Sequence, residues 1–139
     1  MNIRQLQEAD YETIIEAIDD WFDGRQMSHL LPRIFFIHFR PTSFVIEEDG
    51  RVMGFLAGFV SQTYPDQAYI HFVGIEANYR GRGLGRQLYS RFFETVRRLV
   101  ARRFVALLRR RTADLSRFTL EWASALNAVM GNATASLAP

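Results

Sequence analysis

The chain has 139 residues, of which 48% are hydrophobic and 14% aromatic, which fits one packed domain and excludes a disordered chain. It has no cysteine, which excludes disulfides, a thiolate nucleophile and cysteine metal sites. The net charge of +2 hides an acidic first fifty residues and seven arginines between 97 and 111. With no signal-peptide pattern and no membrane-spanning apolar run, we expect a cytoplasmic protein.

The first forty residues predict one strand and two helices. Residues 2–6 alternate like a short edge strand. Residues 8–22 carry apolar side chains at near-helical spacing with acids on the other face, and Asp23-Gly24 ends this helix. A second helix is predicted from Pro32 through Phe39, with Pro41 closing it.

Two strands follow, at residues 43–47 and 52–60. The Asp49-Gly50 pair between them is a hairpin signal. Gly54 and Gly58 lie inside the second strand, where glycine marks a close backbone approach or a bulge.

A turn at 64–66 leads to a strand at 67–75 and, after a glycine-rich turn, to a helix from Leu84 to Leu99. One helical stripe is predicted to consist of Leu84, Leu88, Phe92, Val96 and Leu99, with Tyr89, Phe93 and Val100 beside it. The predicted order is therefore β-α-α-β-β-β-turn-α.

The glycine-rich turn, Tyr79-Arg80-Gly81-Arg82-Gly83-Leu84-Gly85-Arg86, joins a strand to a helix. This arrangement makes an anion cradle, because glycine admits close approach and a helix begins with unpaired N–H groups. A P-loop is excluded because the chain has no lysine, and the G-x-G-x-G spacing is not that of a Rossmann turn. We interpret the turn as a pyrophosphate site.

Arg80 to Gly85 fits the pattern Arg/Gln-x-x-Gly-x-Gly/Ala, and residues 73–80 fit the junction that precedes it. In these motifs and in its element order, the chain resembles the GNAT family of N-acetyltransferases over residues 1–98. The resemblance implies an α/β fold with a mixed, mostly antiparallel sheet flanked by helices, and acetyl-coenzyme A as cosubstrate without a metal.

The resemblance also implies which residues bind coenzyme A. Main-chain groups of Val73 and Ile75 would pair with the pantetheine arm, and the Val73 N–H would donate to the thioester carbonyl. The glycine-rich turn would hold the pyrophosphate. The expected cofactor-binding residues are Val73, Gly74, Ile75, Arg80, Gly81, Arg82, Gly83, Leu84, Gly85 and Arg86.

Candidates for the general base are His71, Tyr69 and Glu76. Strand alternation predicts Tyr69, His71, Val73 and Ile75 on one face. A histidine packed beside the sheet and a surface glutamate are the structural alternatives. His29 and His38 are candidates for lining the amine site, and the three scattered histidines predict no metal site.

Residues 99–139 depart from the family pattern, so we expect a core at 1–98 and an atypical helical tail at 99–139. Trp122 can only be encoded by TGG and Ala123 begins with GC, so the triplet across them encodes glycine. From Ala113 to Ser124 the displaced frame admits the helix pattern expected of the family. We therefore hypothesise that the reading frame shifts near Leu99.

The expected function is acetyl transfer from acetyl-coenzyme A to a primary amine. The alternative is a coenzyme A-binding protein with little or no catalysis, because the last strand and helix are replaced. An arginine-rich nucleic-acid module is a third interpretation, which the frame hypothesis disfavours. The lost strand would expose a sheet edge, so a homodimer or a rearranged C-terminus is expected.

Overall fold

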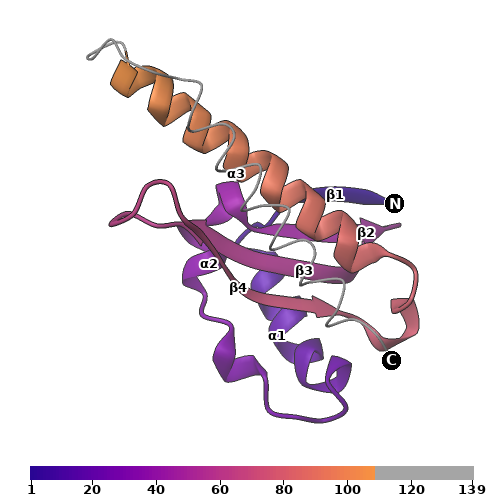
Figure 1. Cartoon of the computed structure of the whole chain (residues 1–139). Coiled ribbons are helices and arrows are strands. Elements are labelled where there is room, and N and C mark those ends of the chain that lie inside the picture. The colour runs from indigo at the N-terminus through magenta and orange to yellow at the C-terminus, as the bar shows by residue number, and fades with distance from the viewer. Residues whose placement is uncertain (109–139) are drawn as a thin grey trace. The chain divides into compact units, whose positions relative to one another are not determined.

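A four-stranded antiparallel sheet, ordered β1-β2-β3-β4, is the frame of the described structure (Figure 1). The computed structural model describes the backbone of residues 1–108 and the side chains of residues 1–102. The strands are β1 Asn2–Gln5, β2 Phe44–Glu48, β3 Arg51–Val60 and β4 Ala68–Ile75. The chain divides into the units Met1–Arg103 and Phe104–Pro139, and the first is described below. The expected boundary between 98 and 99 stays a prediction.

Three helices accompany the sheet: α1 Asp10–Trp21, α2 Ile34–Ile37 and α3 Leu84–Leu108. The predicted element order is confirmed, but the helix predicted from Pro32 to Phe39 is wrong in its bounds. Only Ile34–Ile37 is α-helical: the backbone of Phe39, at φ −109° and ψ 21°, has left the α region, and Pro41 lies inside a separate 3-10 turn at Arg40–Thr42. None of the helices in residues 1–108 is long and apolar enough to cross a membrane.

The predicted hairpin joins β2 to β3 through two residues. Asp49 has φ 50° and Gly50 has φ 78°, and Glu48 pairs directly with Arg51. Positive φ at both central residues is what a two-residue hairpin turn of type I′ requires, and Asp-Gly tolerates it. The hairpin fixes the register of Arg51, which matters for the site below.

The two faces of the sheet are covered by different helices. Ile14, Ile18 and Trp21 of α1 pack with residues of the sheet and of the α2 region in one core cluster. On the other face, α3 buries a stripe at every fourth residue: Leu84, Leu88, Phe92, Val96 and Val100. The stripe continues to Val100 rather than Leu99, which is only half-buried, because spacing of four residues keeps Val100 on that face.

Gly58 allows α3 to lie close to β3, as its position predicted. A Cβ at Gly58 would lie 2.6 Å from Cε2 of Phe92 and 2.9 Å from the Tyr69 carbonyl oxygen. The register shifts beside Gly58, and its carbonyl accepts the Thr42 hydroxyl at 2.7 Å. The irregular pairing therefore leaves the buried Gly58 carbonyl with a hydrogen bond, because the Thr42 side chain supplies the donor.

The same shift puts an extra residue in β4. Ala57 pairs with Phe72 and Gly58 pairs with Ile70, so His71 has no partner in the ladder. The prediction that Tyr69, His71, Val73 and Ile75 share a face is therefore wrong. The bulge at His71 inverts the alternation, because one inserted residue flips every later side chain.

An ion-pair cluster ties β1, α1 and β2 together. The Arg4 guanidinium donates to both carboxylate oxygens of Asp10 at 2.8 Å and to Glu47 at 2.8 Å. Burial alone would raise the pKa of Asp10, but hydrogen bonds from Arg4 and from the Gln7 N–H outweigh it and hold that pKa below its usual range.

Candidate active site

The glycine-rich turn before α3 presents a row of unpaired N–H groups. Among the described residues, none accepts a hydrogen bond from the six N–H groups of residues 81–86. Gly81 has φ 75° and Gly83 has φ 76°, and a Cβ at Gly81, Gly83 or Gly85 would meet nothing within 4 Å. The turn thus exposes a row of backbone donors at the positive end of a long helix, which suits an anion.

Arg80 belongs to the motif, but its guanidinium already donates to carbonyl groups of the protein. It donates to the carbonyl of Trp21, the last residue of α1, and its Nε donates to the Ile75 carbonyl at 3.3 Å. It also lies over the ring of Phe22, 5.8 Å from the centroid. Arg80 therefore caps the negative end of α1, and the arginines left for an anion at the turn are Arg82 and Arg86.

A second arginine, Arg51, braces the turn from the β2–β3 hairpin. It donates to Glu76 at 2.5 Å, and this ion pair raises the pKa of Arg51. The guanidinium groups of Arg51 and Arg82 lie 5.6 Å and 5.1 Å from the centroid of the Tyr79 ring. Glu76 is therefore not a free surface carboxylate: it is 9% exposed and already paired.

The outer edge of β4 leads to this turn. The Glu76 N–H donates to the Met53 carbonyl of β3 at 2.9 Å. Because successive residues of a strand direct their main-chain groups to opposite sides, those of Val73 and Ile75 point away from β3. No other strand in residues 1–108 pairs with β4 on that side. The main-chain groups of Gly74, in contrast, face β3, and a Cβ on Gly74 would lie 2.7 Å from the Phe55 ring.

His71, at the bulge, contacts the segment between α1 and α2. Its Nε2 lies 2.6 Å from the Leu30 carbonyl oxygen, and its ring stacks on Phe35 with centroids 4.8 Å apart. Because a carbonyl oxygen only accepts, this contact needs the proton on Nε2. A neutral His71 therefore carries its lone pair on Nδ1.

The other candidate side chains are more exposed. Tyr69 is 57% exposed and packs on Phe59 with centroids 5.6 Å apart. His29 and His38 are also exposed. The structure thus brings His71 into direct contact with the segment between α1 and α2, whereas Tyr69 precedes the bulge in β4 and is not described as contacting that segment.

The segment between α1 and α2 is held by Asp19, which the sequence analysis did not identify. Its Oδ1 accepts the N–H groups of Ser28 and Met27, each at 2.8 Å. These hydrogen bonds, that from Ser28 first, hold the pKa of Asp19 below its usual range. The N–H groups that Asp19 accepts lie eight and nine residues later, so no short sequence motif predicts this contact. The contact between Arg51 and Glu76 could not be predicted either, because it depends on the register of the hairpin.

These features define a class of protein: one in which an unpaired sheet edge leads to a turn whose free N–H groups suit an anion. Residues 2–115 match the model of the Acetyltransferase (GNAT) family, so the chain belongs to this family. The family resemblance is confirmed. The match also extends past Leu99.

Two curated relatives are L-2,4-diaminobutyric acid acetyltransferases. The one from Virgibacillus pantothenticus is 47% identical over 47 residues, 34% of this chain and 30% of that relative. The one from Nocardia farcinica (strain IFM 10152) is 34% identical over 58 residues, 42% of this chain and 30% of that relative. The matched stretches thus span less than a third of either relative.

A solved structure with the same fold is the diaminobutyrate acetyltransferase EctA from Paenibacillus lautus, in complex with L-2,4-diaminobutyric acid and coenzyme A. Its TM-score is 0.55 at 18% identity, covering 66% of this chain and 55% of that one. At this identity the likeness confirms the fold and nothing finer.

Proposed function

We propose that the chain is an N-acetyltransferase that transfers the acetyl group of acetyl-coenzyme A to a primary amine. One observation carries this proposal: within the described residues, the six N–H groups of residues 81–86 have no acceptor, and a Cβ at Gly81, Gly83 or Gly85 would meet nothing within 4 Å. Membership of the GNAT family supports the same cosubstrate.

In this proposal the N–H groups from Gly81 to Arg86 bind the diphosphate, with Arg82 and Arg86 adding charge. Arg80 does not contact the diphosphate in this proposal; it supports the turn through its hydrogen bond to the end of α1. The outward main-chain groups of Val73 and Ile75 bind the pantetheine arm, although the Ile75 carbonyl is shared with Arg80.

Bound acetyl-coenzyme A would supply an acetyl thioester. His71 then takes one proton from the amine at Nδ1 while the amine nitrogen forms its bond to the acetyl carbon. The Val73 N–H donates to the carbonyl oxygen as negative charge develops there. The C–S bond breaks, the released thiolate takes a proton from solvent, and His71 returns to solvent the proton that it accepted. His71 suits this role better than Glu76, whose carboxylate is paired with Arg51.

For the acceptor we propose a small diamino acid of the L-2,4-diaminobutyrate type. The support is the name of both curated relatives and the ligand of the EctA structure. The test is release of free thiol from acetyl-coenzyme A by the full chain with L-2,4-diaminobutyrate. L-2-Aminobutyrate, which lacks only the second amine, is the matched control. Thiol release with both compounds, or with neither, would contradict this acceptor.

A coenzyme A-binding protein without useful turnover is the second candidate. It is favoured by one observation: within residues 1–108 the sheet ends at β4. Calorimetric binding of acetyl-coenzyme A without thiol release, across a panel of primary amines, would support this candidate over the enzyme.

A further inference from the structure

A pocket of about 320 Å³ lies between α3 and the β1–β2 side of the sheet. Arg4, Gln5 and Phe44 line it from the strand side, and Arg91, Thr95, Arg98, Leu99 and Arg102 line it from α3. The site proposed above uses none of these residues. The volume falls at the lower end of the range for small-molecule sites.

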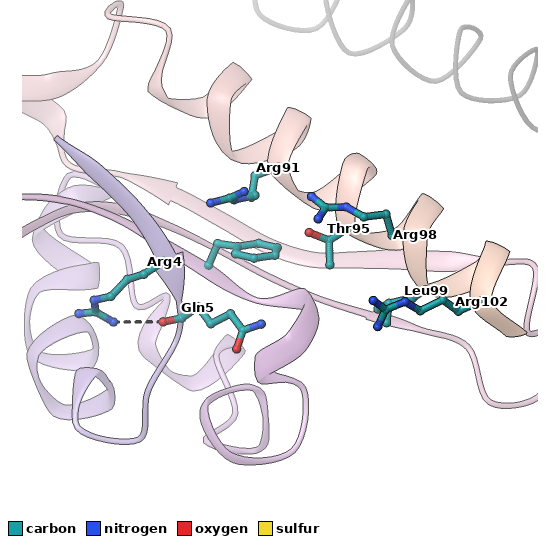
Figure 2. A pocket seen from close by; sticks show the side chains of 8 residues that line it. Arg4, Gln5, Arg91, Thr95, Arg98, Leu99 and Arg102 are labelled. Atoms are coloured by element: carbon teal, nitrogen blue, oxygen red, sulfur yellow. Dashed lines mark hydrogen bonds between the residues drawn. The ribbon is translucent and has the colours of Figure 1, made fainter.

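Figure 2 shows how the α3 side chains lie in this pocket. Arg91, Thr95 and Arg98 project from the same side of α3, and all three line the pocket. Like charges gathered in one concavity repel each other unless a counter-charge is present. The pocket therefore favours an anionic occupant.

Two of the four arginines already have carboxylate partners. Arg4 is paired with Asp10 and Glu47, and Arg98 is paired with Glu94 at 2.7 Å. Each of these positive charges is balanced within the protein.

The other two are Arg91 and Arg102, and neither forms an ion pair with another described residue. Arg91 contacts only a neutral group, the Ile3 carbonyl oxygen, at 3.3 Å. The pocket therefore has two positive charges without a described counter-charge, which favours an anionic occupant.

We propose that this pocket binds a small phosphate monoester. Guanidinium groups donate in pairs to phosphate oxygens, and the Thr95 hydroxyl and Gln5 amide supply further donors. Phe44, which is 3% exposed, and Leu99 give the pocket an apolar part suited to the ester group. The concave shape favours a small molecule over the extended backbone of a nucleic acid.

The test is calorimetry of phenyl phosphate and of inorganic phosphate with the full chain, at constant ionic strength. Phenyl phosphate should bind more tightly than inorganic phosphate, and Arg91→Gln and Arg102→Gln should each weaken it about tenfold. Arg97→Gln is the matched control: it removes the same charge from an exposed position of α3 that does not line the pocket. It should change the affinity less than about twofold.

Because phosphate could also bind the glycine-rich turn, Arg82→Gln is a second arm and should leave phenyl phosphate binding intact. The proposal is overturned by absence of heat, by equal losses in Arg97→Gln, or by a loss confined to Arg82→Gln. Succinate binding as tightly as phenyl phosphate would overturn the choice of a phosphate. Arg91→Gln also removes the hydrogen bond to the Ile3 carbonyl and could unfold the protein. In that case Arg102→Gln tests the proposal, because no such hydrogen bond is described for Arg102.

Discussion

The guanidinium of Arg80 donates to the carbonyl of Trp21, the last residue of α1. One arginine of the family motif therefore joins the glycine-rich turn to the end of α1. The sequence pattern does not distinguish arginines that support the turn from arginines that would bind the diphosphate. The contact with Trp21 gives Arg80 the first role and leaves the second to Arg82 and Arg86 in our proposal.

We expect Arg80→Gln and Arg82→Gln to have different effects. Arg80→Gln should lower the free energy of unfolding by about 0.5–1 kcal/mol, because a helix C-terminus loses its cation. Its affinity for acetyl-coenzyme A should fall only slightly. Arg82→Gln should leave stability within about 0.5 kcal/mol and lower the affinity about tenfold. Urea unfolding and calorimetry measure both quantities, and equal affinity losses would contradict the separation.

The backbone of the turn can be tested with Gly83→Ala. At φ 76° an added Cβ costs about 1–2 kcal/mol of backbone strain. It would also occupy open space beside the unpaired N–H groups. Gly50→Ala is the control, since its φ is 78° and it is equally open but lies in the β2–β3 hairpin. Both variants should lose similar stability, and only Gly83→Ala should lose affinity for acetyl-coenzyme A. Similar affinity losses in both would mean that strain alone is responsible.

The role of His71 can be tested with a pair of substitutions. His71→Gln keeps an N–H donor for the Leu30 carbonyl but cannot take a proton, so kcat should fall about 10²–10⁴-fold with little change in stability. His71→Ala should lose the same activity and also the contact with Leu30, so it should melt earlier. Full activity in His71→Gln would exclude His71 as the base, and a comparable loss in Tyr69→Phe would transfer the role to Tyr69.

The Arg4–Asp10 pair predicts a specific pH dependence of stability. The folded pKa of Asp10 lies below its unfolded value of about 3.9, so its contribution is complete above that value and is lost as pH falls through the folded pKa. Asp10→Asn should therefore lower stability by about 2 kcal/mol at pH 7 and flatten the decline of stability below about pH 4. Asp20→Asn, on an exposed position of α1, controls for charge. An unchanged acid slope in Asp10→Asn would contradict the account.

The frame hypothesis for the tail can be tested on the gene. The displaced frame from the Leu99 codon to the Trp122 codon should contain no stop, and a chain restored to that frame should gain turnover. Residues 109–139 lie outside the described part of the chain, so the tail, the replaced strand and the homodimer stay predictions. A stop codon before Trp122 in the displaced frame would end the hypothesis.

The sequence predicted the fold through local patterns. The Asp49-Gly50 turn, the glycine-rich turn and the four-residue spacing on α3 each follow from rules that act within a few residues. The α2 region was overpredicted because its apolar run, which includes Phe35 and Phe36, reads as helix while tertiary packing sets a shorter one.

The side-chain roles depended on contacts between distant segments. The bulge at His71 is defined by the pairing of β4 with β3, next to the Gly58 carbonyl that accepts the Thr42 hydroxyl, and no pattern within β4 predicts it. The direction of the Arg80 side chain depends on where α1 ends, and the pairing of Glu76 depends on the hairpin register. The position of the glycine-rich turn in the fold could therefore be predicted, whereas the contacts that hold His71, Arg80 and Glu76 could not.

The most direct test is calorimetric titration of the full chain with acetyl-coenzyme A and, separately, with S-acetylpantetheine, which lacks the diphosphate. If main-chain amides of the glycine-rich turn bind the diphosphate, acetyl-coenzyme A should bind at least about a hundredfold more tightly. Equal affinities for the two compounds, or no heat with acetyl-coenzyme A, would contradict the account.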